Sequence, residues 1–104
     1  MLKRFLPYGK QHINNNDIQS VIKVLKSNFI TQGPNIDKFE REFAKYVGVK
    51  YAVSCATGTA ALHLSCLVLG LNSKSSLITS SITFVASANC AEFIGAKVYL
   101  TDID

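Results

Sequence analysis

The stretch of residues 51–69 constrains the fold of this chain more than any other part of it. A short apolar run, residues 51–53, is followed by the small and hydroxyl-bearing residues 54–59, and a long apolar run then extends to Leu69. A strand that ends in small residues and turns directly into a helix leaves the first N–H groups of that helix unpaired. The dipole of the helix adds partial positive charge at this end. The stretch therefore predicts a strand, an anion-binding turn and a helix.

Three residues of this turn have the chemistry to hold a phosphate. Gly58 has no Cβ and lets a phosphate approach the backbone, while Thr57 and Thr59 offer hydroxyl groups. Thr-Gly-Thr before an apolar run is also an ordinary helix N-cap, and spacing alone leaves this alternative open. The glycine fingerprints of dinucleotide-binding and nucleoside-triphosphate-binding loops are both absent. A phosphate bound here would therefore belong to another cofactor.

The first half of the chain has the pattern of two helices. Apolar residues recur at helical spacing in residues 18–25, behind a start signal at residues 14–17, and recur again in residues 36–47. Gly33 and Pro34 break the helical pattern between them, Asn35 is the expected cap of the second helix, and Gly48 is its expected stop.

After residue 50 the pattern alternates between strands and helices, which indicates the α/β class. The predicted strands are residues 51–54, 77–79 and 98–100, and the predicted helices are residues 58–69 and 83–93. Gly70 and Gly95 follow these helices, as C-terminal stop residues do. The helix at 58–69 is apolar almost all round, so it is expected to be buried on more than one side. A parallel sheet of three short strands normally has both faces covered, and no further strand is predicted to pair with the last one, so we expect either exposed sheet edges or a partner.

Composition excludes several function classes. The chain has 104 residues with 48% hydrophobic content, as expected for one small globular domain. Its net charge of +4 comes from scattered Lys and Arg residues without a basic stripe, which argues against nucleic-acid binding. No apolar run is long enough for a signal peptide or a membrane span, so we expect a protein without membrane contact that resides in the cytoplasm.

The cysteine and histidine residues suggest neither a disulfide framework nor a metal site. Cys55, Cys66 and Cys90 form no C-x-x-C pair and lie among small or apolar residues, which predicts reduced thiols in the core. His12 and His63 have no second ligand at helical spacing, and His63 is interpreted as a packing residue. We expect no bound metal.

Several segments, in this order and spacing, carry a family resemblance. They are residues 7–11 (Pro-Tyr-Gly-Lys-Gln), 17–21 (Asp-Ile-Gln-Ser-Val), 31–34 (Thr-Gln-Gly-Pro), 39–40 (Phe-Glu), 56–63 (Ala-Thr-Gly-Thr-Ala-Ala-Leu-His), 83–89 (Thr-Phe-Val-Ala-Ser-Ala-Asn) and 102–104 (Asp-Ile-Asp). Together they resemble the N-terminal part of the DegT/DnrJ/StrS family of sugar aminotransferases. These enzymes use pyridoxal phosphate on the type I (aspartate-aminotransferase-like) fold.

The resemblance implies roles for four residues. The turn of Thr57, Gly58 and Thr59 would hold the phosphate of pyridoxal phosphate through backbone N–H groups, and Phe84 would stack on the pyridine ring. Without the resemblance, Phe84 would be interpreted as a core aromatic. The complete enzyme would transfer an amino group from glutamate to a nucleotide-linked keto sugar in amino-sugar biosynthesis, as a homodimer.

The resemblance also implies that this chain is incomplete as an enzyme. It would comprise an N-terminal helical arm, about residues 1–48, and the start of the large cofactor-binding α/β domain, about residues 49–104. In the family, the lysine that forms the Schiff base, the Asp that pairs with the pyridinium nitrogen and a further phosphate ligand follow this region. No catalytic residue is assigned here, and we expect the chain alone to be inactive. The alternative is a truncated, non-catalytic interaction module that pairs through its open sheet edge and apolar helix.

Overall fold

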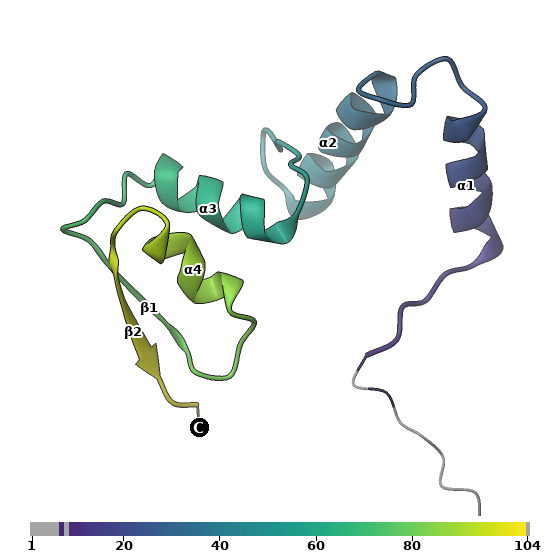
Figure 1. The fold of residues 1–104 in the computed structure, drawn as a ribbon. Coiled ribbons are helices and arrows are strands. Elements are labelled where there is room, and N and C mark those ends of the chain that lie inside the picture. The colour runs from purple at the N-terminus through teal and green to yellow at the C-terminus, as the bar shows by residue number, and fades with distance from the viewer. Residues whose placement is uncertain (1–6, 8, 104) are drawn as a thin grey trace, which may run out of the picture. The chain divides into compact units, whose positions relative to one another are not determined.

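The computed structural model describes residue 7 and residues 9–103. The resemblance segments at residues 7–11 and 102–104 each include one residue outside this range, Tyr8 and Asp104. The elements along the chain are α1 (Asn15–Leu25), α2 (Pro34–Val47), α3 (Gly58–Val68), β1 (Ser76–Ser80), α4 (Ala86–Glu92) and β2 (Lys97–Thr101), as Figure 1 shows. The chain divides into two compact units, Met1–Phe39 and Glu40–Asp104.

In the first unit, α1 begins where the sequence predicted a helix start, and it does so with a reciprocal cap. The side chain of Asn14 accepts hydrogen bonds from the backbone N–H groups of Asn16 and Asp17 at 2.8 and 3.3 Å. The Asp17 carboxylate in turn accepts from the Asn14 N–H at 2.8 Å. This capping box pairs N–H groups that the first turn of a helix cannot pair internally.

The break between α1 and α2 lies where the Gly-Pro pair predicted it. Gln32 and Gly33 both have positive φ angles, 58° and 88°. A Cβ on Gly33 would come within 2.8 Å of the Phe29 Cβ, so this position requires glycine. The prediction that Asn35 caps α2 is wrong, because α2 already begins at Pro34. Proline suits the first helical position since its fixed φ matches the helix and no N–H is left unpaired there.

In the second unit, β1 and β2 form a parallel two-stranded sheet, with Ser76 opposite Lys97 and Ser80 opposite Thr101. Helix α4 connects the two strands and packs against both of them and against α3. The buried residues of this packing are small: Cys66, Ala86, Cys90, Ala91 and Ala96. Small side chains let α4 lie close to its neighbours. The predicted α/β class is confirmed, and Gly48, Gly70 and Gly95 have the positive φ angles expected of helix stops.

Two predicted elements differ in the structure. The predicted strand at residues 51–54 is not formed, because these residues pair with neither β1 nor β2. The predicted helix at residues 83–93 is shorter, since α4 begins only at Ala86. The residues just before it form a turn in which the Thr83 and Ser87 hydroxyl groups lie 2.9 Å apart.

Burial of α3 is lower than predicted. Only Cys66 of this helix is buried, whereas Val68 is 86% exposed. The reason is that α4 covers one side of α3 and no other described element packs against it.

The core placement predicted for the cysteines is confirmed for Cys66 and Cys90 and wrong for Cys55, which is exposed. His63 packs edge-on against Phe93 at 5.3 Å between ring centroids, as its interpretation as a packing residue predicted.

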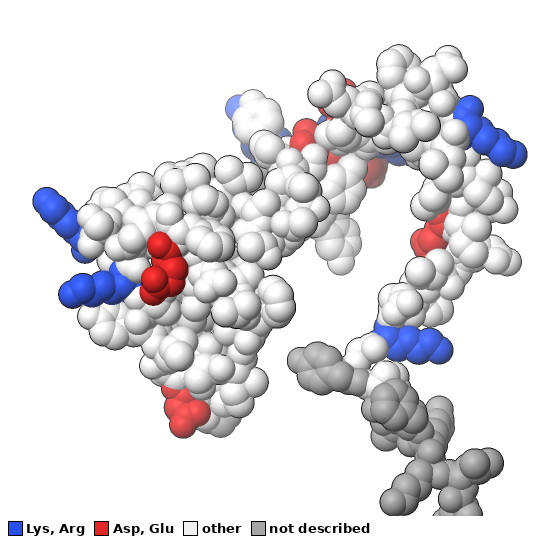
Figure 2. All heavy atoms as spheres, viewed as in Figure 1, with Lys and Arg blue, Asp and Glu red and all other residues white. Residues whose placement is uncertain are grey.

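Charged side chains are sparse on the face of the molecule that Figure 2 shows. Figure 2 shows that, on the face in view, the Lys, Arg, Asp and Glu side chains are dispersed and that most of the surface is uncharged. Many large apolar side chains are exposed, among them Val53, Ile78 and Phe84 at 85%, 72% and 74%. Within the described part of the chain, no helix combines the length and apolar character that crossing a membrane requires.

Candidate functional site

The turn before α3 presents backbone N–H groups as the sequence predicted. Thr57 is the N-cap of α3: its backbone is extended, and its hydroxyl oxygen accepts a hydrogen bond from the Ala60 N–H at 3.1 Å. The Thr57 carbonyl accepts from the Ala61 N–H at 3.0 Å. Among the described residues, the N–H groups of Gly58 and Thr59 have no partner. These two donors are therefore available to a ligand at the positive end of the helix dipole.

The space in front of Gly58 is open. A Cβ placed on this residue would meet no atom within 4 Å, and the residue itself is exposed. Apart from its chain neighbours Thr57 and Thr59, no described side chain therefore fills the space beside Gly58, which leaves this exposed position open to a phosphate. The N–H groups and the hydroxyls of Thr57 and Thr59 are hydrogen-bond donors that suit a phosphate, and the helix dipole adds partial positive charge beside them.

Replacing Thr57 with alanine is expected to destabilise α3 by about 1 kcal/mol, because the Ala60 N–H loses its cap. Chemical denaturation followed by circular dichroism measures this loss. Thr57→Ser keeps the hydroxyl and is the matched control. A Thr57→Ser variant as unstable as Thr57→Ala would contradict the capping role.

Immediately upstream, Ser54 is held by a carboxylate from α2. The Glu40 Oε1 atom accepts hydrogen bonds from the Ser54 N–H at 2.7 Å and from the Ser54 hydroxyl at 2.8 Å. Both residues are half-buried and belong to the second unit. The bond from the Ser54 N–H, followed by that from its hydroxyl, lowers the pKa of the Glu40 carboxyl from its ordinary value of 4.5. Sequence reasoning missed this pair, although Phe39-Glu40 was among the segments that carried the resemblance.

The lowered pKa gives this link a defined pH dependence. Because the folded-state pKa of Glu40 is below the unfolded value, the link is fully formed above pH 4.5 and is lost as the pH falls through the lowered pKa. In an NMR titration, the Glu40 carboxyl carbon and the Ser54 amide should shift together, with a midpoint below 4.5. A midpoint at or above 4.5 would contradict the link, and Ser54→Ala, which removes one of the two donors, should move the midpoint towards 4.5.

The predicted stacking residue lies on a separate segment. Phe84 follows the carboxyl end of β1 and precedes α4, and its side chain is 74% exposed. Its carbonyl accepts a hydrogen bond from the Ser87 N–H at 2.9 Å, which fixes the backbone of the turn. The exposed ring has a face available for stacking. The exposure of Phe84 does not match the core position that would be expected without the resemblance. Its role in stacking on the cofactor ring remains a prediction.

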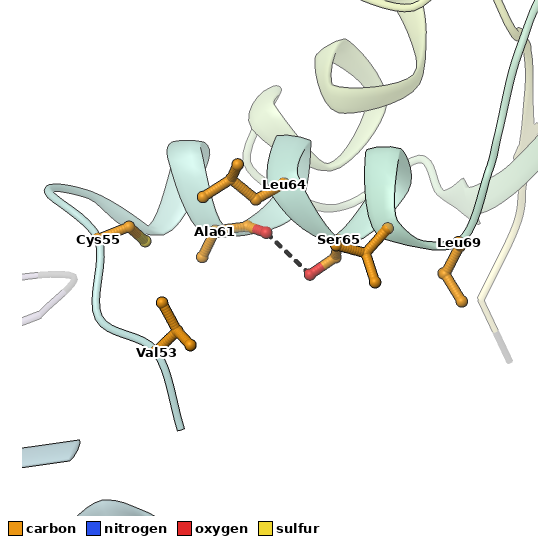
Figure 3. A pocket seen from close by; sticks show the side chains of 7 residues that line it. Val53, Cys55, Ala61, Leu64, Ser65 and Leu69 are labelled. Carbon is orange, nitrogen blue, oxygen red and sulfur yellow. Dashed lines mark hydrogen bonds between the residues drawn. The ribbon is translucent and has the colours of Figure 1, made fainter. Parts of the chain in front are cut away.

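A groove of about 600 Å³ runs along another face of α3 (Figure 3). Val53 and Cys55 line it from the segment before the helix, and Leu64, Val68 and Leu69 line it from α3 and its end. Ser65 also lines it, but its hydroxyl donates to the Ala61 carbonyl at 2.8 Å. The rest of the lining is apolar apart from the Cys55 thiol, so this groove suits an apolar group and not a phosphate.

Comparison with known proteins decides the family. The sequence model of the DegT/DnrJ/EryC1/StrS aminotransferase family matches residues 11–104 of this chain. The chain belongs to this family. The resemblance stated from the sequence segments is therefore confirmed.

Two curated relatives of this chain are nucleotide-sugar aminotransferases by name. The chain is 40% identical over 98 residues to the UDP-4-amino-4,6-dideoxy-N-acetyl-beta-L-altrosamine transaminase of Campylobacter jejuni, covering 94% of this chain and 26% of that protein. It is 38% identical over 104 residues to the UDP-4-amino-4-deoxy-L-arabinose–oxoglutarate aminotransferase of Shewanella sediminis, covering 100% of this chain and 27% of that protein. The chain thus spans about a quarter of the length of the curated relatives it matches.

A solved relative confirms the fold class. A putative sugar aminotransferase from Streptococcus pneumoniae, in its PLP form, matches with a TM-score of 0.83 and 29% identity. The match covers 95% of this chain and 25% of that protein. The same protein has been solved in a PMP form. The type I fold predicted from the resemblance is confirmed, with the sheet of this chain incomplete at two strands.

Proposed function

We propose that this chain supplies the cofactor-phosphate site of a pyridoxal-phosphate aminotransferase that acts on a nucleotide-linked keto sugar. Glutamate is the proposed amino donor, and the name of the Shewanella relative, an oxoglutarate aminotransferase, supports this choice. The whole protein is proposed to act in the cytoplasm as a homodimer. Residues of about 1–48 would form its helical arm, and residues of about 49–104 the start of its cofactor-binding domain.

The observation that supports the site is the pair of unpaired N–H groups at Gly58 and Thr59, with open space in front of Gly58. In the proposed site these groups, together with the hydroxyls of Thr57 and Thr59, bind the phosphate of pyridoxal phosphate and fix its position. The exposed Phe84 ring stacks on the cofactor ring and holds its orientation. The cofactor, when bound, supplies the electron sink that amino-group transfer requires. This chain therefore contributes the binding and orientation of the cofactor. The lysine that transfers protons is proposed to lie in the part of the enzyme that this chain, about a quarter of the length of its relatives, does not include.

The phosphate site can be tested with the 104-residue chain. Pyridoxamine phosphate is the probe, because it has no aldehyde and cannot react with the lysines of the chain. The amide signals of Gly58 and Thr59 should shift in an NMR titration with this probe and with inorganic phosphate. Pyridoxamine, which lacks the phosphate, is the matched control. Equal shifts with pyridoxamine, or shifts confined to other residues, would contradict the proposed site.

The absence of a catalytic lysine from this chain is tested separately. The chain is mixed with pyridoxal phosphate, reduced with borohydride and analysed by mass spectrometry. The expected result is scattered, substoichiometric lysine adducts. A single stoichiometric adduct that is lost on enlarging Gly58 would instead place the active site within this chain.

The activity of the whole protein is tested by 2-oxoglutarate release from glutamate in the presence of a UDP-linked keto sugar.

A further inference from the structure

We propose that Glu40 is a positioning residue that fixes the conformation of the phosphate-binding turn through Ser54. This inference rests on the proposed function, in which the turn at residues 57–59 binds the cofactor phosphate. Glu40 does not itself contact the cofactor in this proposal. It acts from α2 on the segment that leads into α3.

The link differs from the other side-chain hydrogen bonds of the unit. Glu40 and Ser54 are 14 positions apart, and one carboxylate oxygen accepts from both the backbone N–H and the hydroxyl of Ser54, at 2.7 and 2.8 Å. Apart from the contact between the buried Cys66 and Cys90 thiols, side-chain hydrogen bonds within residues 44–103 join residues no more than four positions apart. The link therefore joins two segments that local structure does not join.

The segment that leads into the turn has few other constraints. Residues 51–55 have no regular secondary structure, and no described backbone–backbone hydrogen bond involves residues 50–56. Upstream, the Val49 N–H donates to the Ala44 carbonyl at 2.9 Å, and downstream Thr57 caps α3. Ser54 lies between these two fixed points. Without Glu40, the backbone from residue 50 to residue 56 would gain conformational freedom that phosphate binding would then have to remove.

The role requires an acceptor at position 40 and does not require its negative charge. The bound phosphate is itself an anion, so the charge of Glu40 adds nothing favourable to its binding. Glutamine retains an acceptor oxygen at the same position, although its hydrogen bonds are weaker than those of a carboxylate. A positioning role therefore predicts that Glu40→Gln keeps most of the wild-type behaviour and that Glu40→Ala does not.

The test compares four variants of the 104-residue chain by amide hydrogen exchange and by titration with pyridoxamine phosphate. In Glu40→Ala, the Ser54 amide should exchange on the order of tenfold faster, and the affinity for the probe should fall by roughly three- to tenfold. Glu40→Gln should restore both values to within about threefold of wild type. Ser54→Ala keeps the backbone bond and should give an intermediate loss. Glu42→Ala, an exposed position on the same helix, is the matched control and should change neither value.

The outcomes separate this inference from the proposed function. Unchanged amide exchange rates of Ser54 and of residues 55–58 in Glu40→Ala would overturn the positioning role. A Glu40→Gln variant with the exchange rates and affinity of Glu40→Ala would also overturn it. If Glu40→Ala fails to fold, the intermediate loss predicted for Ser54→Ala decides the question. A wild-type chain that does not bind pyridoxamine phosphate would contradict the phosphate site, and the exchange results would still decide whether Glu40 orders the turn.

Discussion

Replacing Gly58 with alanine is expected to weaken the binding of pyridoxamine phosphate by at least about tenfold while leaving the chain folded. A hydrogen bond to a charged group contributes about 1.5–3 kcal/mol, and each 1.4 kcal/mol corresponds to a factor of ten in affinity. In the proposed site, the new methyl group would lie in the open space beside Gly58 from which a phosphate would approach the Gly58 and Thr59 N–H groups. Because that space contains no protein atom within 4 Å, the substitution creates no clash in the free chain.

Stability and binding should therefore separate in this variant. Alanine is a better helix former than glycine, so the free energy of unfolding should stay constant or rise by up to about 1 kcal/mol. Binding is measured by NMR titration and stability by chemical denaturation. Gly9→Ala is the matched control, because a Cβ at Gly9 also meets no atom within 4 Å and the residue lies in the other unit. Equal affinities for the two variants would mean that the phosphate does not approach the chain at Gly58.

Features that depend on neighbouring residues could be predicted from the sequence. The start of α1 follows from Asn14 and Asp17, because both partners of the capping box lie within one helical turn. The ends of α3 and α4 follow from Gly70 and Gly95, which adopt the positive φ angles that other residues avoid. The turn before α3 was predicted on the same local grounds. The roles of Thr57, Gly58 and Thr59 in cofactor binding remain predictions until a ligand is tested.

Features that depend on distant residues could not be predicted. Residues 51–54 have the composition of a strand, but a strand also requires a paired neighbour, and these residues pair with neither β1 nor β2. The Ser54 N–H is instead paired with Glu40, 14 positions earlier, and no periodic pattern points to that pairing. The exposure of Val68 also depends on distant residues. The apolar composition of α3 predicts that the helix is buried, but it does not show which elements are present to cover it.

Replacing Ala91 with leucine is expected to have the largest effect on stability of any substitution considered for this chain. Ala91 has no exposed surface, and the other buried residues in the packing of α4, among them Cys66, Cys90 and Ala96, are also small. Overpacking a core costs about 1–3 kcal/mol. A core of this size rarely contributes more than about 3–5 kcal/mol, so the substitution should remove most of the stability of residues 40–103.

The matched control for this prediction is Glu92→Leu, which places the same side chain on the next, exposed position of α4. Urea denaturation followed by circular dichroism should give a midpoint near wild type for Glu92→Leu and a much lower midpoint, or no transition, for Ala91→Leu. The difference measures how tightly α4 packs between α3 and the sheet, because both variants change helix propensity and hydrophobicity in the same helix. Equal midpoints would mean that α4 has room for larger side chains. In that case the small residues of α4 would not be what determines its position between α3 and the two strands.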